Sequence, residues 1–181
     1  MKFSLLVALF CGLVPYLAIG QNKHAQLQKE DNVTVTIDSV AFCKVLGQLL
    51  ADAPGNFEKE KGNVIETTST GMIYSTNRGL PGAITSSIIL EKEWSYDGVI
   101  YQGQSKGGLE KAYYACKNVL DACLVSIGFT RNTNNNEGKG LEKYPVVRYS
   151  KPNVAGPVVM LKLENSDFNA LYTVSVVVSS K

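Results

Sequence analysis

The clearest structural signal in this chain lies in residues 107–128, GGLEKAYYACKNVLDACLVSIG. Apolar side chains recur there every three or four positions, which is typical of a helix that buries one face. Glu110 falls in the first turn, where the helix dipole favours a negative charge, and Gly128 is a natural helix end. The segment therefore predicts an amphipathic helix with this buried stripe: Leu109, Ala112, Tyr113, Cys116, Leu120, Cys123, Leu124 and Ile127.

A first helix is expected upstream of this segment. Asp38-Ser39 supplies side-chain oxygens that can cap its start. Pro54-Gly55 ends it, because proline cannot continue the hydrogen-bond ladder. The apolar positions between these limits again follow helical spacing: Phe42, Val45, Leu46, Leu49, Leu50 and Ala53.

Strands are predicted around and between the two helices. Residues 77–82 form a turn-rich loop that separates two of them. Asp97-Gly98 is predicted to be a hairpin turn, because both residues tolerate positive φ. In this first half the segments with strand-like alternation are residues 33–37, 67–76, 83–94 and 99–102.

The second half of the chain also ends in strands. Residues 132–140 hold no apolar side chain and predict an exposed loop. Residues 166–169 are expected to form a hairpin turn before the last strand, in which Val174, Val176 and Val178 alternate with polar residues. The predicted strands are residues 144–149, 157–164 and 170–179.

The order of elements is helix, three strands, helix, three strands, which is a repeated plan. Because hairpins dominate, the sheet is expected to be mainly antiparallel, with about five to six strands and both helices on one face. The fold class predicted is therefore a two-layer α+β domain. One such domain is expected to span residues 33–181.

Residues 1–20, MKFSLLVALFCGLVPYLAIG, have the pattern of a secretory signal peptide. A cationic start is followed by an apolar core and small residues, which predicts cleavage after Gly20 and discards Cys11. Residues 21–32 are polar and predict a flexible lead-in. The mature protein is expected to be secreted or periplasmic, with no membrane span after signal removal. A net charge of +2 gives no broad attraction for nucleic acid.

Three cysteines remain after the signal. Two of them, Cys116 and Cys123, are about 10 Å apart if they share one helix, because each residue adds about 1.5 Å. A disulfide needs its Cα atoms within about 7 Å. Any intramolecular bridge must therefore join Cys43 to Cys116 or to Cys123. Three buried thiols without a bridge are the alternative.

Catalytic and metal-binding patterns are scarce in the sequence. The single histidine, His24, lies in the polar lead-in, and the cysteines lack the close spacing of a zinc site. We expect no metal and no cofactor. Glu91 and Glu93, two apart on one predicted strand, are the carboxylate pair that a small extracellular hydrolase of glycans or peptides would use.

Residues suited to partner contact gather around the first predicted hairpin. Arg78 lies in the preceding loop, and Trp94, Tyr96 and Tyr101 flank the predicted turn. These residue types are frequent at binding hot spots, although Trp94 also continues the apolar face of its strand. The function predicted is a non-enzymatic domain that binds a protein or a small ligand. The alternatives are the carboxylate-dependent hydrolase and a structural envelope protein held by a disulfide.

Overall fold

The structure is a computed structural model that describes residues 35–134, 144–166 and 171–180. The predicted signal peptide and lead-in lie outside these residues, as does nearly all of the predicted turn at residues 166–169. The helices are α1 (Ser39–Asp52) and α2 (Lys106–Val125), with a 3-10 turn η1 (Ala53–Gly55) after the first. The strands are β1 (Lys61–Thr67), β2 (Met72–Thr76), β3 (Thr85–Leu90), β4 (Trp94–Gly103), β5 (Thr130–Asn134), β6 (Val146–Ser150), β7 (Val158–Ser166) and β8 (Leu171–Ser179).

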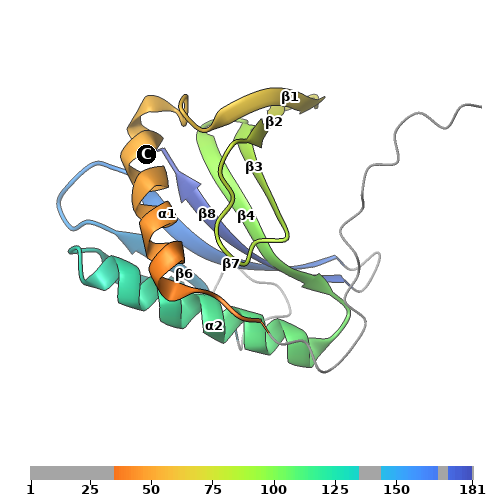
Figure 1. The fold of residues 1–181 in the computed structure, drawn as a ribbon, viewed down its shortest axis with the longest axis vertical. Coiled ribbons are helices and arrows are strands. Elements are labelled where there is room, and N and C mark those ends of the chain that lie inside the picture. Colours follow the sequence, from red (N-terminus) through yellow and green to blue (C-terminus); the bar gives the residue numbers. More distant parts are fainter. Residues whose placement is uncertain (1–34, 135–143, 167–170, 181) are drawn as a thin grey trace, which may run out of the picture.

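The strands form one antiparallel sheet in the order β1-β2-β3-β4-β8-β7-β6-β5. Both helices lie on the same side of this sheet (Figure 1). The predicted two-layer α+β class is thus confirmed, but the sheet has eight strands rather than five to six. The additional strands, β1 and β5, are the two edges of the sheet and carry mostly exposed side chains. They lack the apolar alternation by which buried strands are recognised.

The repeated plan is visible in the topology. Each half of the described chain is one helix followed by four strands. The sheet order is symmetric about its centre, where the last strand of one half, β4, pairs with the last strand of the other, β8. The continuous sheet therefore joins two equivalent units through their final strands.

The predicted hairpin turn at Asp97-Gly98 is wrong. Both residues lie inside β4 and pair with β3 on one side and β8 on the other. The chain reverses at residues 91–93 instead. Gly98 is suited to this place by close packing, because a Cβ there would lie 3.1 Å from the Tyr96 ring and 3.2 Å from Leu80. Pairing on both edges of β4 overrides the local turn preference.

Three further expectations need correction. The segment 67–76 is not one strand, because a turn held by the amide of Gly71 donating to Thr68 Oγ1 (3.0 Å) separates β1 from β2. Residues 35–37, the described part of the strand predicted over 33–37, are not in a strand. Residues 132–134, predicted to be loop, belong to β5, where a sheet edge accommodates polar side chains.

The helix starts follow from short polar side chains. Asp38 Oδ1 accepts hydrogen bonds of 3.0 Å from the amides of Val40 and Ala41, as the sequence predicted. At α2 the cap is Ser105, whose Oγ accepts from the Gly108 amide at 3.1 Å. Each cap satisfies donors that the first helical turn leaves unpaired.

A disulfide between Cys43 and Cys123 joins α1 to α2, with Cα atoms 5.2 Å apart. Of the two pairings that the sequence left open, this is the one present. Cys116 is a buried free thiol, and its burial raises its pKa to about 12. A thiol held neutral in this way is a packing group and not a nucleophile.

Candidate ligand-binding site

Two of the residues predicted to contact a partner are inside the core. Tyr96 and Tyr101 are fully buried. The Tyr96 hydroxyl bonds to the Leu80 amide (2.9 Å) and to Ser86 Oγ (2.8 Å), and the Tyr101 hydroxyl donates to the Ser105 carbonyl (2.9 Å). Their hydroxyls satisfy backbone and side-chain groups next to the sheet. These two tyrosines therefore present no side chain to a partner.

The other two predicted contact residues are held by intramolecular partners. Arg78 Nε lies 3.0 Å from the buried carboxylate of Glu60, and a second Arg78 nitrogen bonds to Gln48 on α1. Trp94 is partly buried, with Lys61 Nζ 4.7 Å from its ring centroid. The four residues singled out in the sequence do not form a common surface.

The predicted carboxylate pair lies in a turn and not on a strand face. Glu91 and Glu93 belong to the reversal between β3 and β4. Glu93 Oε2 accepts a hydrogen bond from Ser179 Oγ at 3.2 Å, whereas Glu91 is exposed. They border a shallow recess of about 220 Å³ that also contains Lys92 and Lys162. The pair thus lies in an open turn beside lysines and not in an enclosed apolar site.

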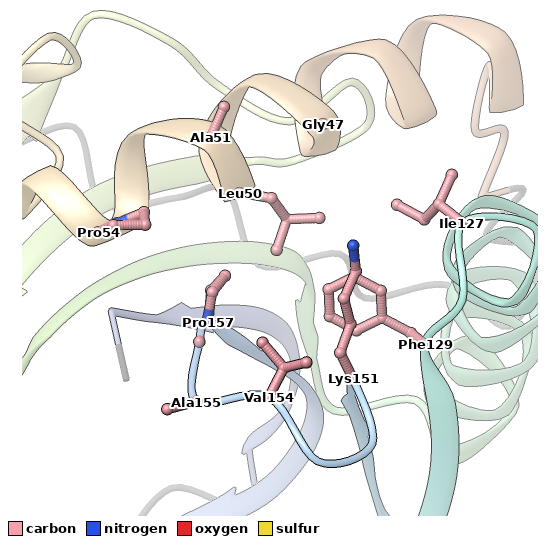
Figure 2. Close-up of a pocket in the computed structure, with 11 residues that line it drawn as sticks. Gly47, Leu50, Ala51, Pro54, Ile127, Phe129, Lys151, Val154, Ala155 and Pro157 are labelled. Atoms are coloured by element: carbon pink, nitrogen blue, oxygen red, sulfur yellow. The ribbon is translucent and has the colours of Figure 1, made fainter.

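An apolar hollow of about 360 Å³ lies at the end of the helical layer. We call it the helix-end hollow (Figure 2). Leu50 points into it from α1, and Ile127 and Phe129 border it where the chain leaves α2. Val154 and Pro157 close the opposite side from the loop between β6 and β7. The other lining residues are Gly47, Ala51, Pro54, Lys151, Ala155 and Gly156.

Local backbone features open this hollow. Gly47 contributes no side chain to the middle of α1, and a Cβ added there would meet nothing within 4 Å. Gly128, with φ of 88°, reverses the chain after α2 and separates the two apolar residues on either side of it. Asn153, with φ of 58°, turns the β6–β7 loop toward the helices. The hollow is thus bounded by one helix, one turn and one loop from distant parts of the sequence.

A second hollow of about 250 Å³ adjoins the first along the contact between α1 and α2. The two share Gly47, Leu50 and Ile127 as lining residues. The disulfide between Cys43 and Cys123 lies at the wall of the second one. The two hollows are thus neighbours along α1, one beside the β6–β7 loop and the other beside the disulfide.

The helix-end hollow contains one charged side chain, Lys151. Its Nζ lies 5.5 Å from the centroid of the Phe129 ring. In Figure 2 the nitrogen ends in the space between Leu50 and Ile127. The hollow is therefore apolar with a single positive charge over it.

Two apolar residues at this site are open to solvent. Ile127 is 50% exposed and Val154 is 61% exposed. Sequence reasoning placed Ile127 on the buried stripe, because its spacing is the same as that of core residues. Lys151 and Val154 carried no signal, since their position depends on how the β6–β7 loop folds back on the helices. The one local sequence feature that could have indicated the hollow was Gly47, a glycine within a helical pattern.

Comparison with known proteins gives no relative from which a function could be transferred. No family model matches the chain, no curated protein is similar to it, and no solved structure matches it. Within the described ranges, no group of three or more histidine, cysteine or acidic side chains is arranged to hold a metal ion. None of the helices in this part of the chain has the length and apolar character needed to cross a membrane.

Proposed function

We propose that this protein is a non-enzymatic, secreted or periplasmic binding protein that takes an apolar small ligand in the helix-end hollow. The observation that carries the proposal is the hollow itself. Its volume of about 360 Å³ lies within the range of roughly 300–1,000 Å³ typical of small-molecule sites. Like those sites, it is lined mainly by apolar side chains and has one polar group.

The energetic argument concerns the exposed wall of the hollow. Ile127 and Val154 expose apolar surface, which costs about 25 cal/mol for each Å² in contact with water. A ligand that covers both residues removes this surface from water. The hollow is therefore suited to an apolar guest.

The disulfide supports the predicted location. Disulfides persist in oxidising compartments and are rare in the cytosol. The bond between Cys43 and Cys123 fits the secretion that the predicted signal peptide implies. It also fixes α1 against α2 beside the hollow, which favours a preformed site.

The two alternatives receive less support. The hydrolase would use Glu91 and Glu93, but Glu91 is exposed in a turn and Glu93 is hydrogen-bonded to Ser179. A structural envelope protein would also contain the disulfide, yet that role gives no reason for an open apolar hollow. The hollow is the observation that favours ligand binding over both.

A substitution that fills the hollow tests the proposal. Gly47→Leu places a side chain where a Cβ meets no protein atom within 4 Å, and it replaces a poor helix former. We expect wild-type protein to bind the neutral fluorescent probe N-phenyl-1-naphthylamine saturably. The Gly47→Leu variant should bind it at least tenfold more weakly while melting at the same temperature or higher.

The matched control is Lys44→Leu, which adds a leucine to an exposed position of α1 that does not line the hollow. It should bind the probe as wild-type protein does. Equal affinity in wild-type and Gly47→Leu proteins, or no saturable binding to wild-type protein, would overturn the proposal.

A further inference from the structure

The charge of Lys151 is uncompensated within the site. Across the described ranges, Lys151 forms no ion pair, and no carboxylate lines the helix-end hollow. Its contact with the Phe129 ring is a cation–π interaction, worth about 0.5–1 kcal/mol at an exposed site. Lys151 is exposed, and this contact places its side chain along the wall of the hollow (Figure 2).

A ligand in the hollow changes the surroundings of this charge. An apolar guest that fills the hollow lies against the Lys151 side chain, which lines it, and displaces water from around the ammonium. Removing water from an unpaired charge is costly, whereas an anionic group on the ligand compensates for the loss. A neutral guest would have to push the lysine away from Phe129. The site therefore discriminates by charge as well as by apolar surface.

We infer that the ligand is a single-chain amphiphile with one anionic head group, such as a fatty carboxylate, and that Lys151 is its counter-ion. This inference rests on the proposed binding function. One lysine matches one negative charge, and the head group pairs with the ammonium through a charge-assisted hydrogen bond. The apolar chain occupies the hollow.

The size of the space favours one chain over two. The helix-end hollow holds about 360 Å³, and the adjoining hollow extends it as a narrow apolar track beside the disulfide. A track bounded by α1 on one side and the end of α2 on the other is suited to one flexible hydrocarbon chain.

Three ligands with the same chain and different head groups test the inference. Decanoate, decanol and decyltrimethylammonium would compete with N-phenyl-1-naphthylamine for wild-type protein at neutral pH and low salt. Decanoate should displace the probe about tenfold more effectively than decanol, and decyltrimethylammonium should be the weakest. The preference for decanoate should fall as salt is added, because the pair lies near solvent.

Lys151→Met removes the charge and keeps the length and apolar character of the side chain. In this variant decanoate and decanol should compete equally, and the neutral probe should bind at least as tightly as it does to wild-type protein, because it no longer covers an unpaired charge. Lys44→Met removes a lysine elsewhere on the surface and should keep the wild-type preference.

The outcomes separate the inference from the function on which it rests. If wild-type protein binds the neutral probe but shows no preference for decanoate, or if Lys151→Met keeps that preference, the inference is overturned and the apolar site stands. If the probe does not bind wild-type protein, the proposed function itself fails.

Discussion

Asp97 lies in surroundings within the sheet that are unfavourable to its charge. Its neighbour Tyr96 faces the core, so Asp97 projects from the opposite face of the sheet. Burial raises the pKa of Asp97 to about 6, against the opposing effect of Lys162 and a hydrogen bond from Ser175. The Glu164 carboxylate contributes to this increase in pKa, and Asp97 Oδ1 has no hydrogen-bond partner within the described ranges. Folding therefore favours the protonated form of Asp97 relative to the unfolded chain.

A pH dependence of stability follows at this residue. The pKa of Asp97 is about 6 in the folded protein and 3.8 for an ordinary aspartate, so its contribution to the free energy of unfolding is fully present below about pH 4 and is lost as the pH rises through 6. Two pKa units correspond to about 3 kcal/mol. Asp97→Asn should remove this loss. In urea melts, the free energy of unfolding of the variant relative to that of wild-type protein should therefore increase from pH 4 to pH 7.

Comparing wild-type protein with Asp97→Asn separates the effect of Asp97 from that of the other acidic residues. Asp121 is partly buried, but hydrogen bonds from Lys117 and Tyr149 hold its pKa below the ordinary value. The contribution of Asp121 to the free energy of unfolding is lost as the pH falls, and it is the same in wild-type and Asp97→Asn proteins. A difference between wild-type and Asp97→Asn proteins that does not change with pH would show that Asp97 is not desolvated.

At the scale of elements, α2 is the helix that the sequence predicts best. All but one of the residues predicted for its buried stripe are buried; Ile127, beyond the helix end, is half-exposed. Leu120 is fully buried near the middle of the stripe, so Leu120→Ala should lower the free energy of unfolding by about 2–5 kcal/mol. Urea melts measure this loss, with the exposed Asn118→Ala as control. A loss below about 0.5 kcal/mol would mean that another face of α2 is buried.

The same elements show which features could not be predicted from the sequence. Periodicity predicts α1 and α2 because one face of each helix is buried along its length. It does not separate Leu50 or Ile127, which border a hollow, from neighbours that are fully covered, because the spacing is the same. Asp97-Gly98 has the local preference of a turn, but two adjacent strands hold it in β4. In each of these places distant contacts decide the structure.

At the scale of the molecule, the candidate site depends on both halves of the chain. Leu50 comes from the helix of the first half, whereas Ile127, Lys151 and Val154 come from the second. The halves are joined by the pairing of β4 with β8 and by the disulfide, which closes a sequence separation of 80 residues. A bridge of that span stabilises the fold by about 4 kcal/mol in the chain-entropy model. The disulfide thus secures the packing of α1 on α2 that shapes the hollow.

The measurement that tests the account most directly is a titration of isotopically labelled protein with decanoate, followed by amide chemical shifts in nuclear magnetic resonance. The account predicts saturable shifts that gather at Gly47, Leu50, Ile127, Phe129 and Val154, with small changes on the sheet face that carries Asp97. Shifts that do not saturate, or that gather around Asp97 and Lys162 instead, would contradict the assignment of the helix-end hollow as the binding site.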